Sequence, residues 1–174
     1  MAKNKKAFLR DFYTDETGSY RYEGSYMVCD AAPDVFTRIY TKAALLYFAV
    51  AALMIAAGWV PSTGMEGRFY QLIPYVAGLI ADILALIAVV RVRNGGPKLR
   101  KYIWEKTAGR LPLLLGIALV CAAFSLAALM ILLFTGRLRP AGYGAVIYIA
   151  SQVIALPLLV IIRRDFVKMV WKMG

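Results

Sequence analysis

Histidine is absent from this 174-residue sequence, and cysteine occurs only twice, at Cys29 and Cys121. Histidine and closely spaced cysteines supply most zinc and haem ligands and much of the general acid–base chemistry of enzymes. The sequence also lacks CxxC, GxSxG and HExxH motifs and any acidic cluster suited to Mg²⁺. It therefore predicts a protein that is not an enzyme and has neither a cofactor nor a metal site. The two cysteines are expected to be unpaired apolar residues.

Acidic residues are also scarce, because 10 Asp and Glu stand against 21 Lys and Arg, for a net charge of +11. Hydrophobic residues make up 61% of the chain, whereas a soluble domain usually has about 45–50%. The excess lies in long uncharged runs, and the basic residues stand just outside those runs. This placement is typical of membrane topology rather than of nucleic-acid binding. We therefore expect the lipid bilayer, and no nucleic acid, as a partner.

Four apolar runs cover residues of about 41–60, 70–90, 111–135 and 143–162. Each run is close to the ~20 residues that a helix needs to cross the hydrocarbon of a bilayer. Short linkers follow the first and third runs, so each pair of runs is expected to form an antiparallel hairpin. The sequence thus predicts an all-α integral membrane protein, with a four-span domain over residues 35–174.

Residues 1–34 form a separate polar segment that begins with a short amphipathic stretch. Alternating tyrosines favour a β-hairpin, with strands at Tyr20–Tyr22 and Tyr26–Val28 and a turn at Glu23-Gly24. An isolated hairpin is marginal in water, so this segment is either docked on the membrane face or irregular. A partner-binding role is the functional alternative.

Two further segments outside the spans carry helix-like patterns. Residues Lys98–Lys106 set Leu99, Tyr102 and Ile103 against basic side chains, which predicts a short interfacial helix. The tail that follows Arg164 is expected to continue as a helix lying on the membrane surface.

The distribution of basic residues predicts the orientation of the chain. Only Arg68, Arg137 and Arg139 of the 21 Lys and Arg fall in the two short linkers. The positive-inside rule then places both termini and the central loop in the cytoplasm. Spans rich in Ala, Leu and Val favour a bacterial-type plasma membrane. Basic residues of the loop and tail form a candidate surface for anionic lipid headgroups or an acidic partner, although topology alone also explains them. They are Arg91, Arg93, Lys98, Arg100, Lys101, Lys106, Arg163 and Arg164.

Asp82 lies near the middle of the second apolar run. An acid at this depth in a membrane is costly, and by default it indicates a functional site. Gly78, Ala81 and Ala85 share a helical stripe with Asp82. Because small residues allow helices to approach closely, this stripe is expected to face the bundle and to carry Asp82 inward.

Polar side chains in the third and fourth runs could accompany Asp82. No Lys or Arg lies at a comparable depth, so burial favours the neutral acid. A protonated Asp82 that donates to Gln152 or Ser125 is the expected arrangement. The full candidate set is Asp82, Ser125, Tyr148, Ser151 and Gln152.

Three roles for Asp82 remain open at this point. In the first, Asp82 and the cytoplasmic surface dock a membrane protein partner or a second copy, and the chain is a non-enzymatic accessory subunit. In the second, the chain is a small proton- or cation-coupled transporter or channel that acts as an oligomer through Asp82. In the third, the acid is a hydrogen-bonded core residue. The sequence favours the first, because one acid and four short spans would need a dimer to enclose a path.

Overall fold

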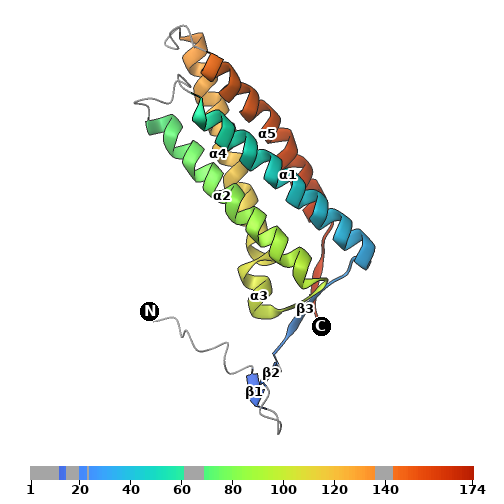
Figure 1. Cartoon of the computed structure of the whole chain (residues 1–174). Coiled ribbons are helices and arrows are strands. Elements are labelled where there is room, and N and C mark those ends of the chain that lie inside the picture. Colours follow the sequence, from blue (N-terminus) through green and yellow to red (C-terminus); the bar gives the residue numbers. More distant parts are fainter. Residues whose placement is uncertain (1–11, 15–19, 23, 61–68, 136–142) are drawn as a thin grey trace.

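The computed structural model describes residues 12–14, 20–22, 24–60, 69–135 and 143–174 (Figure 1). Its long helices are α1 (Pro33–Trp59), α2 (Phe69–Gly95), α4 (Leu111–Phe134) and α5 (Tyr143–Val167). Four helices are long and apolar enough to cross a membrane. The prediction of an all-α architecture with four apolar helices is confirmed. A multi-pass membrane protein is the class that these helices fit.

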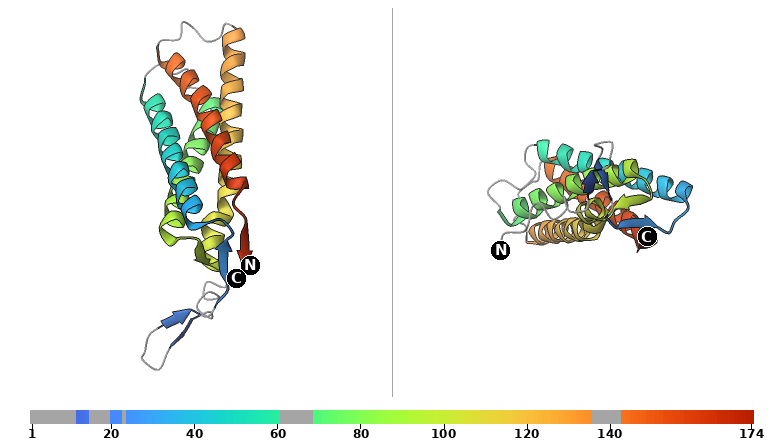
Figure 2. Two further views of the ribbon diagram at one scale, coloured as in Figure 1. Left: turned by 90° about the vertical axis from the view of Figure 1, so that its right-hand side faces the viewer. Right: turned by 90° about the horizontal axis from the view of Figure 1, so that it is seen from below.

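The four long helices form one bundle, which Figure 2 shows from the side and from below. Helix α1 packs against α2 and α5, and α4 packs against the same two helices. Helices α2 and α4 approach closely at Gly78, where a Cβ atom would lie 3.2 Å from the Cβ atom of Cys121. Bulky residues such as Ile80 and Leu84 stand on the outer surface of α2. Small residues therefore pack inside the bundle and large apolar ones face outward, as in membrane bundles.

A three-stranded antiparallel sheet closes one end of the bundle, which we call the sheet end. Strand β3 (Tyr26–Cys29) lies between β4 (Lys98–Arg100) and β5 (Trp171–Met173). Met27 is opposite Leu99 on one side and Met173 on the other. The sheet thus joins three segments that are far apart in the sequence. The opposite end, where α1 ends and α2 begins, is called the far end (Figure 1).

The predicted pairing within the N-terminal segment is wrong in its partners. Strand β2 (Tyr20–Tyr22) pairs with β1 (Phe12–Thr14), not with β3. Strand β3 instead gains two partners and buries Met27 and Cys29. Burial on a helical bundle stabilises short strands that an isolated hairpin could not hold.

Two predicted helices also differ from the structure. Lys98–Arg100 forms strand β4, and only Lys101–Lys106 forms helix α3, which is followed by the 3₁₀ turn η2 (Ala108–Arg110). The tail is helical as far as Val167, and its last residues form β5 instead of a surface helix. Both segments lie beside β3, whose backbone groups they satisfy by pairing.

Candidate functional site

Asp82 lies inside the bundle, with 2% of its surface exposed. It shares the buried face of α2 with Gly78, Ala81 and Ala85, whereas Ile80 on the other side of the helix is half-exposed. The small-residue stripe therefore predicted the inward direction of this side chain correctly. The chain's own helices enclose Asp82, so a partner helix packed on the outside of the bundle would not reach it.

Tyr47 of α1 and Cys121 of α4 are close enough to the Asp82 carboxyl to interact with it electrostatically. Tyr47 is fully buried. Neither its hydroxyl nor Oδ1 of Asp82 has a hydrogen-bond partner within the described part of the chain. Two polar atoms thus lie near the centre of the bundle without the partners that buried polar groups normally have.

A second polar group lies closer to the far end. The Tyr75 hydroxyl donates a 2.7 Å hydrogen bond to the backbone carbonyl of Met54. The Tyr75 and Tyr148 rings are 5.8 Å apart between centroids. Nε2 of Gln152 lies 3.0 Å from the Met54 sulfur. This group links α1, α2 and α5 about two helical turns from Asp82 along α2.

Gly58 provides the space for this contact between α1 and α2. A Cβ atom at position 58 would collide with the Tyr75 hydroxyl and would lie 3.1 Å from Cζ of the same ring. Without a side chain at Gly58, the hydroxyl can reach the Met54 carbonyl one turn earlier on α1. Glycine is therefore required at this position by close approach.

Several polar groups between the middle of the bundle and its far end lack hydrogen-bond partners. Ser151 is satisfied, because its hydroxyl donates to the Tyr148 carbonyl at 2.7 Å. Gln71, in the first turn of α2, is fully buried and both of its amide atoms are unpartnered among the described residues. The other unpartnered buried atoms of the bundle interior in that part of the chain are Tyr47 Oη, Asp82 Oδ1 and Gln152 Oε1, whereas the buried hydroxyls of Ser125 and Tyr148 lie within interaction distance of one another.

These groups divide the bundle interior into two halves. On α2, Gln71, Tyr75 and Asp82 are buried along one face, over about 16 Å from the far end to the middle. From Asp82 to the sheet end, the buried residues of α2 are apolar. They are Ala85, Ala88, Val89 and Val92, and α5 contributes Ala155, Leu159 and Ile162 at corresponding positions. We call the half between Gln71 and Asp82 the polar interior.

The expected hydrogen bond from Asp82 to Gln152 or Ser125 is not formed. The Gln152 carbonyl oxygen is unpartnered among the described residues, the Gln152 amide nitrogen contacts Met54, and the Ser125 hydroxyl lies beside that of Tyr148 instead of Asp82. Gln152 lies at the level of Met54, nearer the far end than Tyr47 and Asp82. Tyr148 and Ser151 lie in the same half of α5.

Sequence reasoning missed Tyr47 and Gln71 as members of this site. Tyr47 stands inside an apolar run, where a tyrosine resembles an ordinary core aromatic. Gln71 stands at the edge of a run, where an amide is expected to face water. A search for every hydroxyl and amide within the runs would have found Tyr47.

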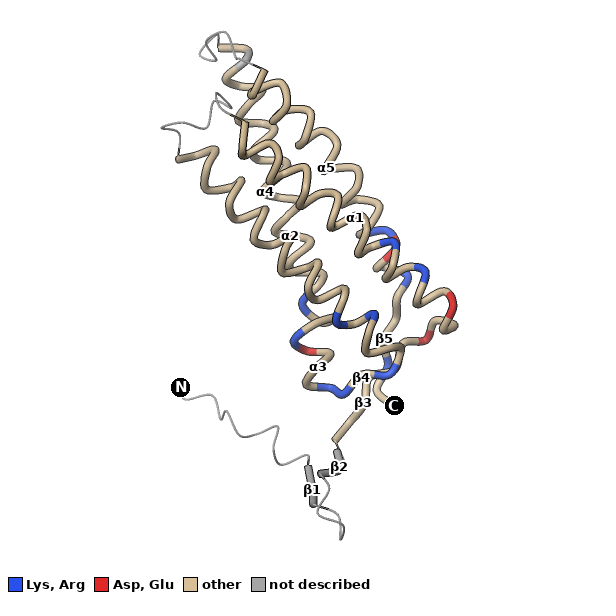
Figure 3. Tube along the Cα trace, viewed as in Figure 1, with Lys and Arg blue, Asp and Glu red and all other residues tan. Residues whose placement is uncertain are grey.

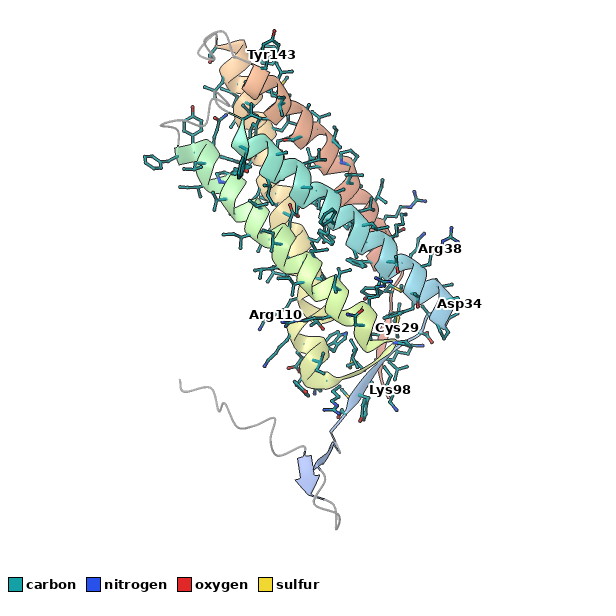
Figure 4. The ribbon with its side chains drawn as sticks, viewed as in Figure 1. Cys29, Asp34, Arg38, Lys98, Arg110 and Tyr143 are labelled. Atoms are coloured by element: carbon teal, nitrogen blue, oxygen red, sulfur yellow. The ribbon has the colours of Figure 1, made fainter. Side chains whose placement is uncertain are left out.

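The eight basic residues predicted as a surface lie apart from this interior. All Lys and Arg of the described chain are at the sheet end (Figure 3). Seven of the eight are exposed and Arg100 is partly buried. Nζ of Lys98 lies 4.6 Å from the centre of the Tyr26 ring. Arg38, Lys98 and Arg110 project at this end, and Tyr143 at the opposite one (Figure 4).

The described residues contain no group of three or more His, Cys, Asp or Glu side chains arranged to hold a metal ion. Within the bundle, oxygen-bearing side chains are the available ligands for a proton or a hard cation. No family model, curated protein or solved structure matches this chain.

Proposed function

We propose that this chain is a non-enzymatic, multi-pass protein of the plasma membrane, built as two antiparallel helical hairpins with both termini in the cytoplasm. Four apolar helices support insertion. The gathering of Lys and Arg at the sheet end supports the orientation, because positive charge is retained on the cytoplasmic side. The far end is then the outer end.

Within this arrangement, Asp82 binds a proton or a small cation that arrives from the outer side. The observation that supports this role is the set of unpartnered buried polar atoms that ends at Asp82. An unsatisfied buried polar group costs about 1–3 kcal/mol, and acids inside membranes mark proton and ion pathways. A ligand that passes along these atoms would offset that cost.

The apolar half of the bundle, between Asp82 and the sheet end, limits how an ion could cross. Val89, Val92 and Ile162 are buried between Asp82 and the sheet end, and they offer no polar group to a moving ion. Passage to the cytoplasm therefore requires the helices to rearrange or a second copy to complete the path. The proposed activity is that of a small coupled transporter or channel that works as an oligomer.

Flux measurements on purified protein in liposomes test this activity. An imposed proton, sodium or potassium gradient should dissipate faster with the wild-type protein than in protein-free liposomes. Asp82→Asn should abolish the difference. Asp34→Asn is the matched control, because Asp34 is an exposed acid in the first turn of α1. Equal flux in the wild type and Asp82→Asn would refute the proposal.

An accessory role is the second candidate, and the sheet supports it. Strands β3, β4 and β5 join the N-terminal segment, the central loop and the tail into one folded platform, and such a platform suits a membrane protein partner or a second copy. In mild detergent, Met27→Pro should release that partner, because proline in the central strand removes sheet hydrogen bonds. Asp82→Asn should retain it. Release by Asp82→Asn alone would contradict docking through the platform.

A further inference from the structure

A cavity of about 300 Å³ lies at the sheet end, between α1, η2 with the start of α4, and the end of α5 with β5. Its walls are largely aromatic. Tyr40, Trp104, Phe166 and Trp171 line it together with Leu111 and Met169. None of these residues belongs to the polar interior. We call this space the aromatic cavity.

The size and walls of the aromatic cavity fit an apolar ligand segment. Protein interiors are close-packed and hold few voids larger than a water molecule, whereas small-molecule sites begin at about 300 Å³ and are mainly apolar with a few polar groups. Tyr40 and Phe166 contact one another, with ring centroids 5.5 Å apart. The cavity is partly open to the outside, so a ligand could enter it.

The polar groups of the lining residues Tyr40 and Trp171 are paired with one another, whereas that of Trp104 is unpaired within the described part of the chain. The indole nitrogen of Trp104 is buried and has no hydrogen-bond partner among the described residues. A buried indole N–H normally finds an acceptor. Because this nitrogen is buried, a ligand oxygen could accept from it only if the Trp104 side chain shifts.

Two cations are sequence neighbours of lining residues of the cavity. Arg110 directly precedes the lining residue Leu111, and Lys168 directly precedes Met169; both cations are exposed. Of the two acids nearby, Asp165 is paired with Lys42 at 2.7 Å. Glu105 is exposed and stands beside Lys106 in the sequence. The border therefore carries a positive excess that suits an anionic headgroup.

We propose that the aromatic cavity binds an anionic phospholipid of the cytoplasmic leaflet. The upper part of an acyl chain occupies the cavity, and the phosphate lies toward Arg110 and Lys168. The position supports a lipid occupant, because the lining residues belong to the ends of the apolar helices and to the sheet end, where the Lys and Arg gather (Figure 3). Headgroups lie at this level of a membrane, where Trp and Tyr are enriched. The inference is independent of ion binding at Asp82.

The three tryptophans of the chain allow a direct test. Trp104 and Trp171 line the cavity, whereas Trp59 is the exposed last residue of α1 at the far end. In a Trp59→Phe background, all tryptophan fluorescence therefore comes from the cavity. The protein is reconstituted in two mixtures of phosphatidylglycerol and phosphatidylcholine. In the first mixture only phosphatidylglycerol carries bromine near the glycerol end of its acyl chains, and in the second only phosphatidylcholine does.

Brominated phosphatidylglycerol should quench the cavity tryptophans at a lower mole fraction than brominated phosphatidylcholine does. Removing both cations with Arg110→Gln and Lys168→Gln should lower this preference by about fivefold or more, since a cation near the membrane surface contributes about 1 kcal/mol of attraction to anionic lipid.

The control variant removes the same charge elsewhere at the sheet end. Arg91→Gln with Arg93→Gln alters two exposed cations of α2, a helix that contributes no residue to the cavity wall. This variant should keep the wild-type preference. Equal quenching by the two lipids in the wild type would overturn the proposal. So would an equal loss of preference in both double variants, because it would indicate general attraction to the membrane.

Discussion

At the scale of single residues, the hydrogen-bonding state of Asp82 separates its possible roles. A core acid kept for stability should be fully hydrogen-bonded, because half-satisfied polar groups weaken a buried core. Asp82 instead has an unpartnered oxygen, and so do Tyr47, Gln71 and Gln152 among the described residues. This pattern favours a site that exchanges a ligand over a static hydrogen-bond network.

Replacement of Asp82 by an apolar residue should therefore stabilise the protein. Asp82→Leu removes a buried polar group and keeps a similar branched shape, and we expect a gain of about 1–3 kcal/mol in the free energy of unfolding. Denaturation with sodium dodecyl sulfate in mixed micelles, followed by circular dichroism, measures it. A loss of stability would indicate that Asp82 is a satisfied structural residue.

Gly58 and Tyr75 should be energetically coupled. Gly58→Ala places a methyl group against the Tyr75 hydroxyl, and it should break the hydrogen bond to Met54. Tyr75→Phe removes the same bond, at a cost of about 0.6 kcal/mol and at most about 2 kcal/mol in a membrane bundle. The double variant should be less destabilised than the sum of the single variants, in the same unfolding assay. Strict additivity would show that the two residues do not touch.

At the scale of elements, the sequence predicted helices far better than strands. Each apolar run produced one long helix, because the length and composition of a run are local properties. Strands β4 and β5 span three residues each, and a segment of that length has no readable alternation. Their pairing with β3 depends on segments roughly 70 or more residues away, so no local pattern could indicate it.

The candidate site shows the same division between local and distant information. The inward direction of Asp82 followed from Gly78 and Ala85 on its own helix. The identity of its neighbours did not, because the level of Gln152 relative to Asp82 depends on how α5 is aligned against α2. The position of Tyr47 near Asp82 likewise depends on how α1 is aligned against α2.

The close approach of α2 and α4 can be tested by cross-linking. A cysteine at position 78 would place its Cβ atom about 3.2 Å from that of Cys121, close to the separation of about 3.5–4.5 Å in disulfides. In a Cys29→Ser background, Gly78→Cys should oxidise to a disulfide within one chain, and mass spectrometry should detect the loss of both free thiols. Ile80→Cys is the control, since its side chain faces outward, and its thiol should stay free. Two free thiols in oxidised Gly78→Cys would contradict this packing.

At the scale of the whole molecule, the charge distribution and the fold distinguish the same two ends of the bundle. The three-stranded sheet joins the central loop and the tail at one end of the bundle. The described Lys and Arg lie at this same end (Figure 3). The far end of the described bundle carries aromatic residues such as Trp59, Phe69 and Tyr143, which suit a membrane interface. The proposed orientation rests on this asymmetry.

Labelling of single cysteines in intact cells tests that orientation. With Cys29 and Cys121 replaced by serine, a cysteine introduced at Lys168 should react only with a membrane-permeable maleimide. A cysteine introduced at Ser62, in the first short linker of the sequence, should also react with an impermeable one. The opposite pattern would place the termini outside and would reverse the direction from which Asp82 is reached.

The most direct test of ion binding at Asp82 is infrared difference spectroscopy of the reconstituted protein. The outer pH, or the outer concentration of sodium or potassium, is changed while the carbonyl band of protonated carboxylic acids is recorded. We expect a band in the wild type that follows the outer solution and is missing in Asp82→Asn. A band that ignores the outer solution, or a difference spectrum that is identical in Asp82→Asn, would contradict it.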